Sequence, residues 1–263
     1  VTDNHPFLSY TYDASRAKKS GRYALGYVRA DELHTALMPR TSIDYGSPWK
    51  LEQPDTVSTF ATSNQYAADL SATRRRSERI EVPEHTTDDL MWLFGLFLGD
   101  GSLEPGRLTF SVPTTDRAYP RLIAVMDSLL PGCAPEVRAD GITSRWSSVA
   151  LVELFERNGL RTGATDKRIP TWVLSTPESQ RIEFLTGLID SDGCATRGRR
   201  GLSFKSVNHA LVADVATLLD TLGLLGHVSS EAAGQRRIRG YASQSRGSHR
   251  LDFPADPRVV ARL

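Results

Sequence analysis

Two short segments of the sequence are nearly alike, and each ends an apolar run with an aspartate and a glycine. They read LFGLFLGDG over residues 93–101 and LTGLIDSDG over residues 185–193. One such segment alone is typical of a helix that stops at a glycine. Because the helix, its final acid and the order of the downstream elements occur twice, we interpret Asp100 and Asp192 as paired carboxylates with a shared role.

Each segment also carries a glycine in the middle of its apolar run. Gly95 and Gly187 each cost a helix about 1 kcal/mol relative to alanine, so we expect a compensating close approach of two backbones. Gly95 and Gly99 share one helix face, as do Gly187 and Ser191. Two such stripes that face each other would let the helices pack closely and would bring the two aspartates together at one end.

Two carboxylates at adjacent helix carboxyl ends repel each other and the negative ends of both helix dipoles. Bound divalent cations would remove this repulsion, and hard oxygen ligands with open coordination positions suit Mg²⁺. The main-chain carbonyls of Gly99 and Ser191 are candidate additional ligands. Such metals lower the pKa of an attacking water and stabilise a leaving oxygen, which is chemistry that cleaves phosphodiesters. We therefore predict Mg²⁺ as the cofactor, with Mn²⁺ or Ca²⁺ able to replace it in binding.

The elements that must position these acids occur in one order twice from Thr87 onward. The first set is a helix from Asp88 to Gly101 with a capping box at Thr86–Asp89, a strand over 107–112, a helix over 118–130, strands over 136–139 and 142–147, and a helix over 148–158. The second set is a helix over 176–191 capped by Thr176, a strand over 201–206, a helix over 208–222, strands over 227–232 and 236–241, and a last helix from Asp256. The fold class is thus predicted as α+β with two αββαββα halves, 87–174 and 175–263.

The chain before these halves differs in composition. Residues 1–46 are rich in aromatic and turn residues and predict a hairpin followed by a short helix near 30–37. Residues 47–86 are polar, contain three prolines and a basic cluster at 74–79, and are interpreted as a linker with one helix near 64–73.

Bulk composition excludes some classes of protein. With 263 residues and 40% hydrophobic content the chain can build a core, and its longest apolar run, Met91 to Leu98, is too short to span a bilayer. The start of the sequence has no secretory signal, so we read Cys133 and Cys194 as reduced thiols of a cytoplasmic protein, prokaryotic or phage-encoded. Net charge is only +1, yet residues 194–250 carry nine Lys or Arg against three acids. This predicts a nucleic-acid surface, although a solvated arginine-rich face remains an alternative.

Strand alternation selects candidate DNA contacts, because one face of a sheet packs on helices and the other can meet base edges. In the first half the candidates are Arg107, Thr109, Ser111, Thr143, Arg145 and Ser147. In the second half they are Ser203, Lys205, Arg237, Arg239 and Tyr241. Candidate phosphate contacts are Arg197, Arg199, Arg200, Arg246 and Arg250, with Arg74, Arg75 and Arg76 extending the footprint. A register shift of one residue would invert a whole strand.

The two repeated segments resemble the paired signatures of LAGLIDADG homing endonucleases. The second is close to the family pattern, whereas the first departs from it at Phe94 and at 97–99 but keeps the glycine, the acid and the final glycine. The resemblance covers residues 87–263 and implies a monomer with a pseudo-twofold axis, whose curved antiparallel sheets bind a long double-stranded DNA target. It also implies metal-dependent cleavage of both strands, with Asp100 and Asp192 as the acids. Lys167, in DKRIP, matches a basic catalytic residue of intein-associated members.

A second resemblance lies at the amino end. VTDNHPF is similar to the T-x-x-H motif of an intein splicing domain, with Thr2 and His5 in the motif positions, so residues 1–46 are interpreted as a splicing-domain remnant. The chain starts at Val1 and has no terminal His-Asn pair, and we expect that it does not splice alone. Two alternatives to a nuclease stay open: a cleavage-deficient DNA- or RNA-binding protein of the same fold, such as a regulator or maturase, and a fragment of a protein-splicing element.

Overall fold

The computed structural model describes residues 6–13, 22–29, 46–54, 80–195, 201–238, 241–245 and 247–263. The chain divides into two compact units, residues 1–41 and 42–263. The smaller unit contains the predicted hairpin, in which β1 (Pro6–Asp13) pairs antiparallel with β2 (Arg22–Arg29). The helices predicted near 30–37 and 64–73 lie outside the described residues. No helix in the described ranges is long and apolar enough to cross a membrane.

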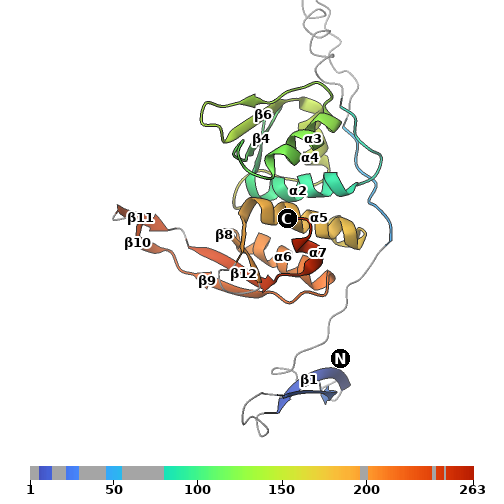
Figure 1. The fold of residues 1–263 in the computed structure, drawn as a ribbon, viewed down its shortest axis with the longest axis vertical. Coiled ribbons are helices and arrows are strands. Elements are labelled where there is room, and N and C mark those ends of the chain that lie inside the picture. Colours follow the sequence, from blue (N-terminus) through green and yellow to red (C-terminus); the bar gives the residue numbers. More distant parts are fainter. Residues whose placement is uncertain are drawn as a thin grey trace, which may run out of the picture. The chain divides into compact units, whose positions relative to one another are not determined.

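The first half of the larger unit has the predicted order of elements with one strand more, β3, which directly follows the first helix (Figure 1). They are α2 (Asp88–Asp100), β3 (Gly101–Glu104), β4 (Arg107–Ser111), α3 (Tyr119–Leu129), β5 (Glu136–Val137), β6 (Thr143–Ser147) and α4 (Val149–Arg157). The four strands form an antiparallel sheet in the order β3-β4-β6-β5. A 3-10 helix, η3 (Thr171–Ser175), leads to the second half.

The second half repeats this order with one insertion. Its elements are α5 (Glu178–Asp192), β7 (Gly193–Ala195), β8 (Gly201–Ser206), α6 (His209–Thr221), β9 (His227–Glu231), β10 (Gly234–Ile238), β11 (Tyr241–Ser245), β12 (Ser248–Pro254) and α7 (Pro257–Val260). The sheet order β7-β8-β12-β9 is equivalent to that of the first half. The α+β class with two αββαββα halves is therefore confirmed.

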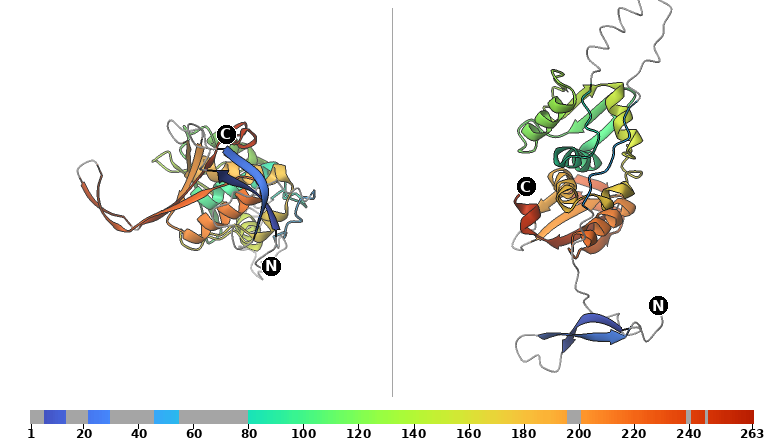
Figure 2. Two further views of the ribbon diagram at one scale, coloured as in Figure 1. Left: turned by 90° about the horizontal axis from the view of Figure 1, so that it is seen from below. Right: turned by 90° about the vertical axis from the view of Figure 1, so that its right-hand side faces the viewer.

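The insertion is a two-stranded ribbon, β10 paired with β11, which extends away from the second sheet (Figures 1 and 2). The prediction of one strand over 236–241 is wrong, because β10 ends at Ile238 and β11 begins at Tyr241. The strand that completes the sheet is β12, which the sequence did not predict. Its apolar residues Leu251 and Phe253 alternate with charged ones, but Pro254 and the preceding glycine-rich segment obscure the pattern.

Helices α2 and α5 lie side by side between the two halves (Figure 2). Every residue from Leu90 to Leu98 is buried, so α2 is apolar on all sides, as expected for a helix enclosed by protein. The rings of Phe94 and Phe97 meet Phe155 of α4 edge-on at centroid distances of 5.1 and 4.9 Å. Phe110 of β4 packs on Phe97, which fixes the sheet against the end of α2 that carries Asp100.

Two predicted helix caps are wrong. The N-cap of α2 is Thr87, whose hydroxyl accepts from Leu90 N, whereas the Thr86 hydroxyl donates to Gln180 Oε1. Thr176 does not cap α5, because its hydroxyl donates to Val173 O and the helix begins after Pro177. In both cases a neighbouring segment provides a competing hydrogen-bond partner, which the local pattern does not reveal.

Candidate active site

The predicted contact between the glycine-bearing helices is present and reciprocal. A Cβ atom built on Gly95 would lie 2.0 Å from the carbonyl oxygen of Phe184 in α5. A Cβ built on Gly187 would lie 2.0 Å from the carbonyl oxygen of Trp92 in α2. One turn further, Gly99 faces Ser191, whose side chain occupies the space of a Cβ. Because each glycine faces backbone of the other helix, no side chain fits at Gly95 or Gly187 without separating the helices.

Gly101 and Gly193, the glycines that follow the two acids, also lie where a side chain would collide with the preceding helix turn. Gly101 and Gly193 have φ values of −93° and −92°, in the extended region, and each begins a strand directly after its helix. A Cβ on Gly101 would lie 2.7 Å from Phe97 Cα, and one on Gly193 would lie 2.6 Å from Ile189 Cα. The Asp-Gly pair therefore lets the chain turn sharply from helix to strand, leaving the acid at the turn.

Asp100 and Asp192 are consequently the last residues of two helices that touch. Burial, with a further contribution from repulsion by Asp192, raises the pKa of Asp100 to about 6 against the opposing effect of Lys167. Burial also raises the pKa of Asp192, again opposed by Lys167. The two carboxylates thus form an electrostatically unfavourable pair, as the sequence predicted.

Lys167 reaches the same helix ends from the segment before η3. Its Nζ donates to the main-chain oxygens of Phe97, Gly99 and Gly101 at 3.2, 2.9 and 2.8 Å. Its own carbonyl accepts from Asn208 Nδ2 at 2.8 Å, which ties the segment to the start of α6. The residue is 7% exposed, and burial lowers the pKa of its ammonium group while both aspartates oppose that shift. Lys167 therefore caps the carboxyl end of α2 and places one positive charge next to two acids.

The residues present fit a hard divalent cation. Burial disfavours the charged forms of both carboxylates. A cation bound between them would stabilise these charged forms. All candidate donors are oxygens, and the set is small enough for water or phosphate to complete it. In the described part of the chain no cluster of three or more His, Cys, Asp or Glu forms a closed metal site. The Gly99 carbonyl, a predicted ligand, already accepts from Lys167.

The register of the first sheet agrees with the predicted alternation. Arg107 pairs with Ser147, Thr109 with Arg145, and Ser111 with Thr143, so all six predicted residues share one face. The other face carries Leu108, Phe110 and Trp146, which are buried in the core. We name the first face, and its counterpart in the second sheet, the open face. Thr109 belongs to the open face but is only 5% exposed, because strands pair with β4 on both sides.

In the second sheet the open face includes Ser203 and Lys205 of β8 and, opposite them, Asp252 and Arg250 of β12. Ser203 is buried, and its hydroxyl lies 3.0 Å from Cys194 Sγ. Arg250, predicted as a phosphate contact, is a strand residue of the sheet.

Several predicted DNA contacts lie elsewhere. Arg237 and Tyr241 were assigned to the sheet, which is wrong, because they belong to the β10–β11 ribbon. The predicted contacts Arg74, Arg75, Arg76, Arg197, Arg199, Arg200, Arg239 and Arg246 lie outside the described residues, as do Thr2 and His5 of the splicing-domain motif.

Two residues near the acids were not predicted. Asp190 of α5 is partly buried beside the helix contact, accepts from Trp92 Nε1 at 2.9 Å, and lies 3.6 Å from Arg117. Asp116, in the loop before α3, raises the pKa of both Asp100 and Asp190 by repulsion. Asp190 stands in the repeated segment itself, but nothing local marks Asp116, whose proximity depends on the loop between β4 and α3.

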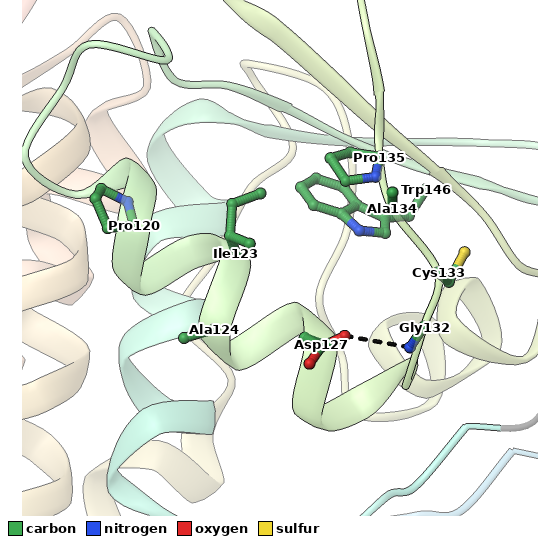
Figure 3. A pocket seen from close by; sticks show the side chains of 9 residues that line it. All are labelled: Pro120, Ile123, Ala124, Asp127, Gly132, Cys133, Ala134, Pro135 and Trp146. Atoms are coloured by element: carbon green, nitrogen blue, oxygen red, sulfur yellow. Dashed lines mark hydrogen bonds between the residues drawn. The ribbon is translucent and has the colours of Figure 1, made fainter.

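A cavity of about 410 Å³ lies in the first half (Figure 3). Its wall includes Ile123 of α3, Trp146 of β6 and the partly exposed Cys133, and Asp127 accepts from Gly132 N at 3.2 Å beside it. Neither Asp100, Asp192 nor Lys167 lines it, so it is separate from the paired acids.

Comparison with known families adds one match. Residues 179–248 match the model of the LAGLIDADG-like domain. This range begins within α5, includes Asp192 and ends at the first residue of β12.

Two curated proteins are similar to the chain. An iron-sulfur cluster assembly SufBD family protein of Mycobacterium leprae is 28% identical over 85% of the chain, and the replicative DNA helicase DnaB of Mycobacterium intracellulare is 27% identical over 98%. The chain spans only 24% and 37% of the length of these two proteins.

Solved structures are similar at low identity. Mesophilic variants of the homing endonuclease I-DmoI match with 18% identity, a TM-score of 0.45, and coverage of 66% of this chain and 92% of theirs. I-DmoI in complex with DNA and Ca gives 18% identity, a TM-score of 0.44, and coverage of 66% and 86%. Full-length DUF199/WhiA from Thermatoga maritima gives 17% identity, a TM-score of 0.40, and coverage of 70% and 57%.

Proposed function

We propose that the protein is a site-specific DNA endonuclease that hydrolyses phosphodiesters in both strands with the help of a divalent metal ion, Mg²⁺. The observation that carries the proposal is the reciprocal glycine contact, which ends in two acids close enough for Asp192 to raise the pKa of Asp100. The LAGLIDADG-like match over 179–248 and the double occurrence of the motif support it.

In this proposal Asp100 and Asp192 hold the metal, and the helix-end carbonyls of Gly99 and Ser191 are secondary candidates. Bound there, a divalent metal would supply Lewis-acid chemistry for phosphodiester hydrolysis and would lower the pKa of an attacking water. Lys167 keeps the carboxyl end of α2 fixed through three carbonyl contacts and balances part of the negative charge of the two acids. The open faces of the two sheets bind the DNA on either side of the acids, within one chain acting as a monomer.

We also propose that the segment is an element inserted into longer proteins, as an intein is. The support is that similar segments occur in a SufBD family protein and in a DnaB helicase, and that each similar region is a minor part of its protein. One of these proteins is named for iron-sulfur cluster assembly and the other for DNA replication. A similar segment in both is explained more simply by an inserted element than by a shared domain. The DNA target is then a gene without the insertion, in the cytoplasm of a prokaryotic or phage-infected cell.

A second candidate is a DNA-binding protein of the same fold that no longer cleaves. The first motif departs from the family pattern at Phe94 and at 97–99, and the family match covers the second half only. Both acids are nevertheless present at the helix ends, which favours the nuclease.

The test uses a supercoiled plasmid library with random inserts, incubated with the protein and Mg²⁺ and selected for linear products. We expect a subset of inserts to be linearised, and Asp100→Asn or Asp192→Asn to abolish cutting while leaving binding. Asp88→Asn, at the opposite end of α2, is the matched control and should cut normally. Sequence-specific binding without any nicking in Mg²⁺ or Mn²⁺ would favour the second candidate, and absence of any DNA binding would reject both.

A further inference from the structure

The strand residues of the two open faces carry balanced charge in the described part of the chain. The cations of these faces are Arg107, Arg145, Lys205 and Arg250, and the acids are Glu104, Glu136, Glu231 and Asp252. A face built only for phosphate attraction would carry an excess of positive charge, since non-specific affinity comes from neutralised phosphates. The balance therefore needs another explanation.

Three of the four cations are held in ion pairs on the face itself. Lys205 Nζ lies 2.9 Å from Glu231 Oε2, and Arg250 Nη2 lies 2.8 Å from Asp252 Oδ1. In the first sheet Arg145 Nη2 lies 3.7 Å from Glu104 Oε1, across the intervening strand β4. The ion pairs of Lys205 and Arg250 are exposed on both sides, and exposed ion pairs contribute little to folding stability. In the third pair Glu104 is 43% exposed but Arg145 only 16%, at the longer distance of 3.7 Å. Folding stability thus gives no strong reason for Glu231 and Asp252 to be on this face.

The first sheet also has unsatisfied polar atoms at this place. Thr109 Oγ1 and Arg145 Nε are buried and have no hydrogen-bond partner among the described residues. Thr109 and Arg145 lie directly opposite each other in the register. Buried polar atoms normally have a hydrogen-bond partner. These two unpaired atoms therefore indicate that a bound ligand supplies the hydrogen-bonding groups that the protein does not.

We propose, on the basis of the proposed DNA-binding function, that Glu104, Glu231 and Asp252 are specificity-determining residues. Each keeps a cation of the open face within the protein until a matched base edge takes the place of the carboxylate. On DNA of the wrong sequence the cation stays paired and the carboxylate faces the negatively charged duplex, which disfavours binding. Arg107, which has no carboxylate within ion-pair distance in the described residues, serves instead as a plain phosphate contact.

The experiment compares single variants that change charge by one unit. Glu104→Gln removes an acid from the open face, and Glu156→Gln removes an exposed acid from α4, on the helix side of the same sheet. Affinity for a random 30-base-pair duplex is measured over a range of salt concentrations without Mg²⁺. We expect Glu104→Gln to steepen the salt dependence by about 0.9, the slope of one freed cation, and Glu156→Gln to leave it unchanged.

Selection from a random duplex pool then tests base preference. We expect Glu104→Gln to relax preference in one half of the selected site, and Glu231→Gln with Asp252→Asn to relax it in the other half. In the triple variant, the ratio of affinities for the selected and the random duplex should fall at least tenfold. Thermal unfolding of each variant checks that the fold is kept.

The outcomes separate this inference from the proposed function. If the wild-type protein enriches a sequence and the variants enrich it equally, with unchanged affinity for random DNA, the role of the acids is overturned and the proposed function stands. If the wild-type protein enriches no sequence, both are overturned.

Discussion

Replacing Gly95 by alanine tests the helix contact on which the candidate site depends. The new Cβ would lie 2.0 Å from the Phe184 carbonyl oxygen, whereas non-bonded heavy atoms need roughly 3.5 Å, so the helices must separate by about 1–1.5 Å. Overpacking of this kind costs about 1–3 kcal/mol, and the better helix propensity of alanine returns about 1 kcal/mol. We therefore expect the free energy of unfolding to fall by up to about 2 kcal/mol.

The effect on activity should be larger than the effect on stability. A displacement of about 1 Å at a catalytic group can cost on the order of 100-fold in rate. In the proposed function this loss follows because the separated acids would no longer hold one cation between them. Urea unfolding gives the stability, calorimetric titration with Ca²⁺ gives the metal affinity, and plasmid linearisation gives the rate.

The control is Ser128→Ala on the exposed face of α3, which raises helix propensity at a residue whose hydroxyl donates within its own helix, to Ala124 O. If Gly95→Ala proved as stable as the wild-type protein and bound Ca²⁺ equally well, the close contact would not position the acids and the reasoning would fail.

Three further predictions use neighbouring residues. Gly99→Ala should lower the free energy of unfolding, because the Ser191 side chain occupies the space that the new Cβ needs. Combining it with Ser191→Gly should restore most of this lost stability. Additive effects in a double-mutant cycle would contradict the prediction. The pKa of Asp100 is about 6 in the folded state and 3.8 as the ordinary value, so between these values the folded protein binds more protons than the unfolded chain. The stability of the metal-free protein should therefore fall as pH rises through this window. Asp100→Asn should flatten the pH dependence of urea unfolding in EDTA, and an unchanged pH profile would refute the assignment. Lys167→Met should lower the free energy of unfolding by about 2–3 kcal/mol, because it leaves the carbonyls that Lys167 pairs with unsatisfied. Lys167→Arg should lose less in the same urea unfolding experiment. Equal losses would show that charge at this position is irrelevant.

The sequence was sufficient to predict elements that depend on local periodicity. Helix α2 is apolar throughout and ends at a glycine, and the alternation in β4 and β6 correctly grouped Arg107, Thr109 and Arg145 on one face. The closeness of α2 and α5 was also predictable, because a glycine inside an apolar helix is costly unless another backbone needs the space.

Features that depend on tertiary contacts were not predictable. Strands β3 and β7 begin at the glycines that end the helices and are only four and three residues long, too short for a pattern. The three carbonyl contacts of Lys167 join residues 66–70 positions apart. The buried state of Thr109 depends on strands that pair with β4 on both sides, and local alternation reports the face of a residue without its exposure.

The reciprocal glycine contact also constrains how such a chain can be recombined. Gly95 needs the bare backbone of α5 at Phe184, and Gly187 needs that of α2 at Trp92, so each half carries part of the geometry of the other. A chimaera that replaces one half by that of a relative will keep its acids aligned only if the incoming helix brings a glycine in the same register. The unit that can be exchanged safely is thus a half together with the helix it faces.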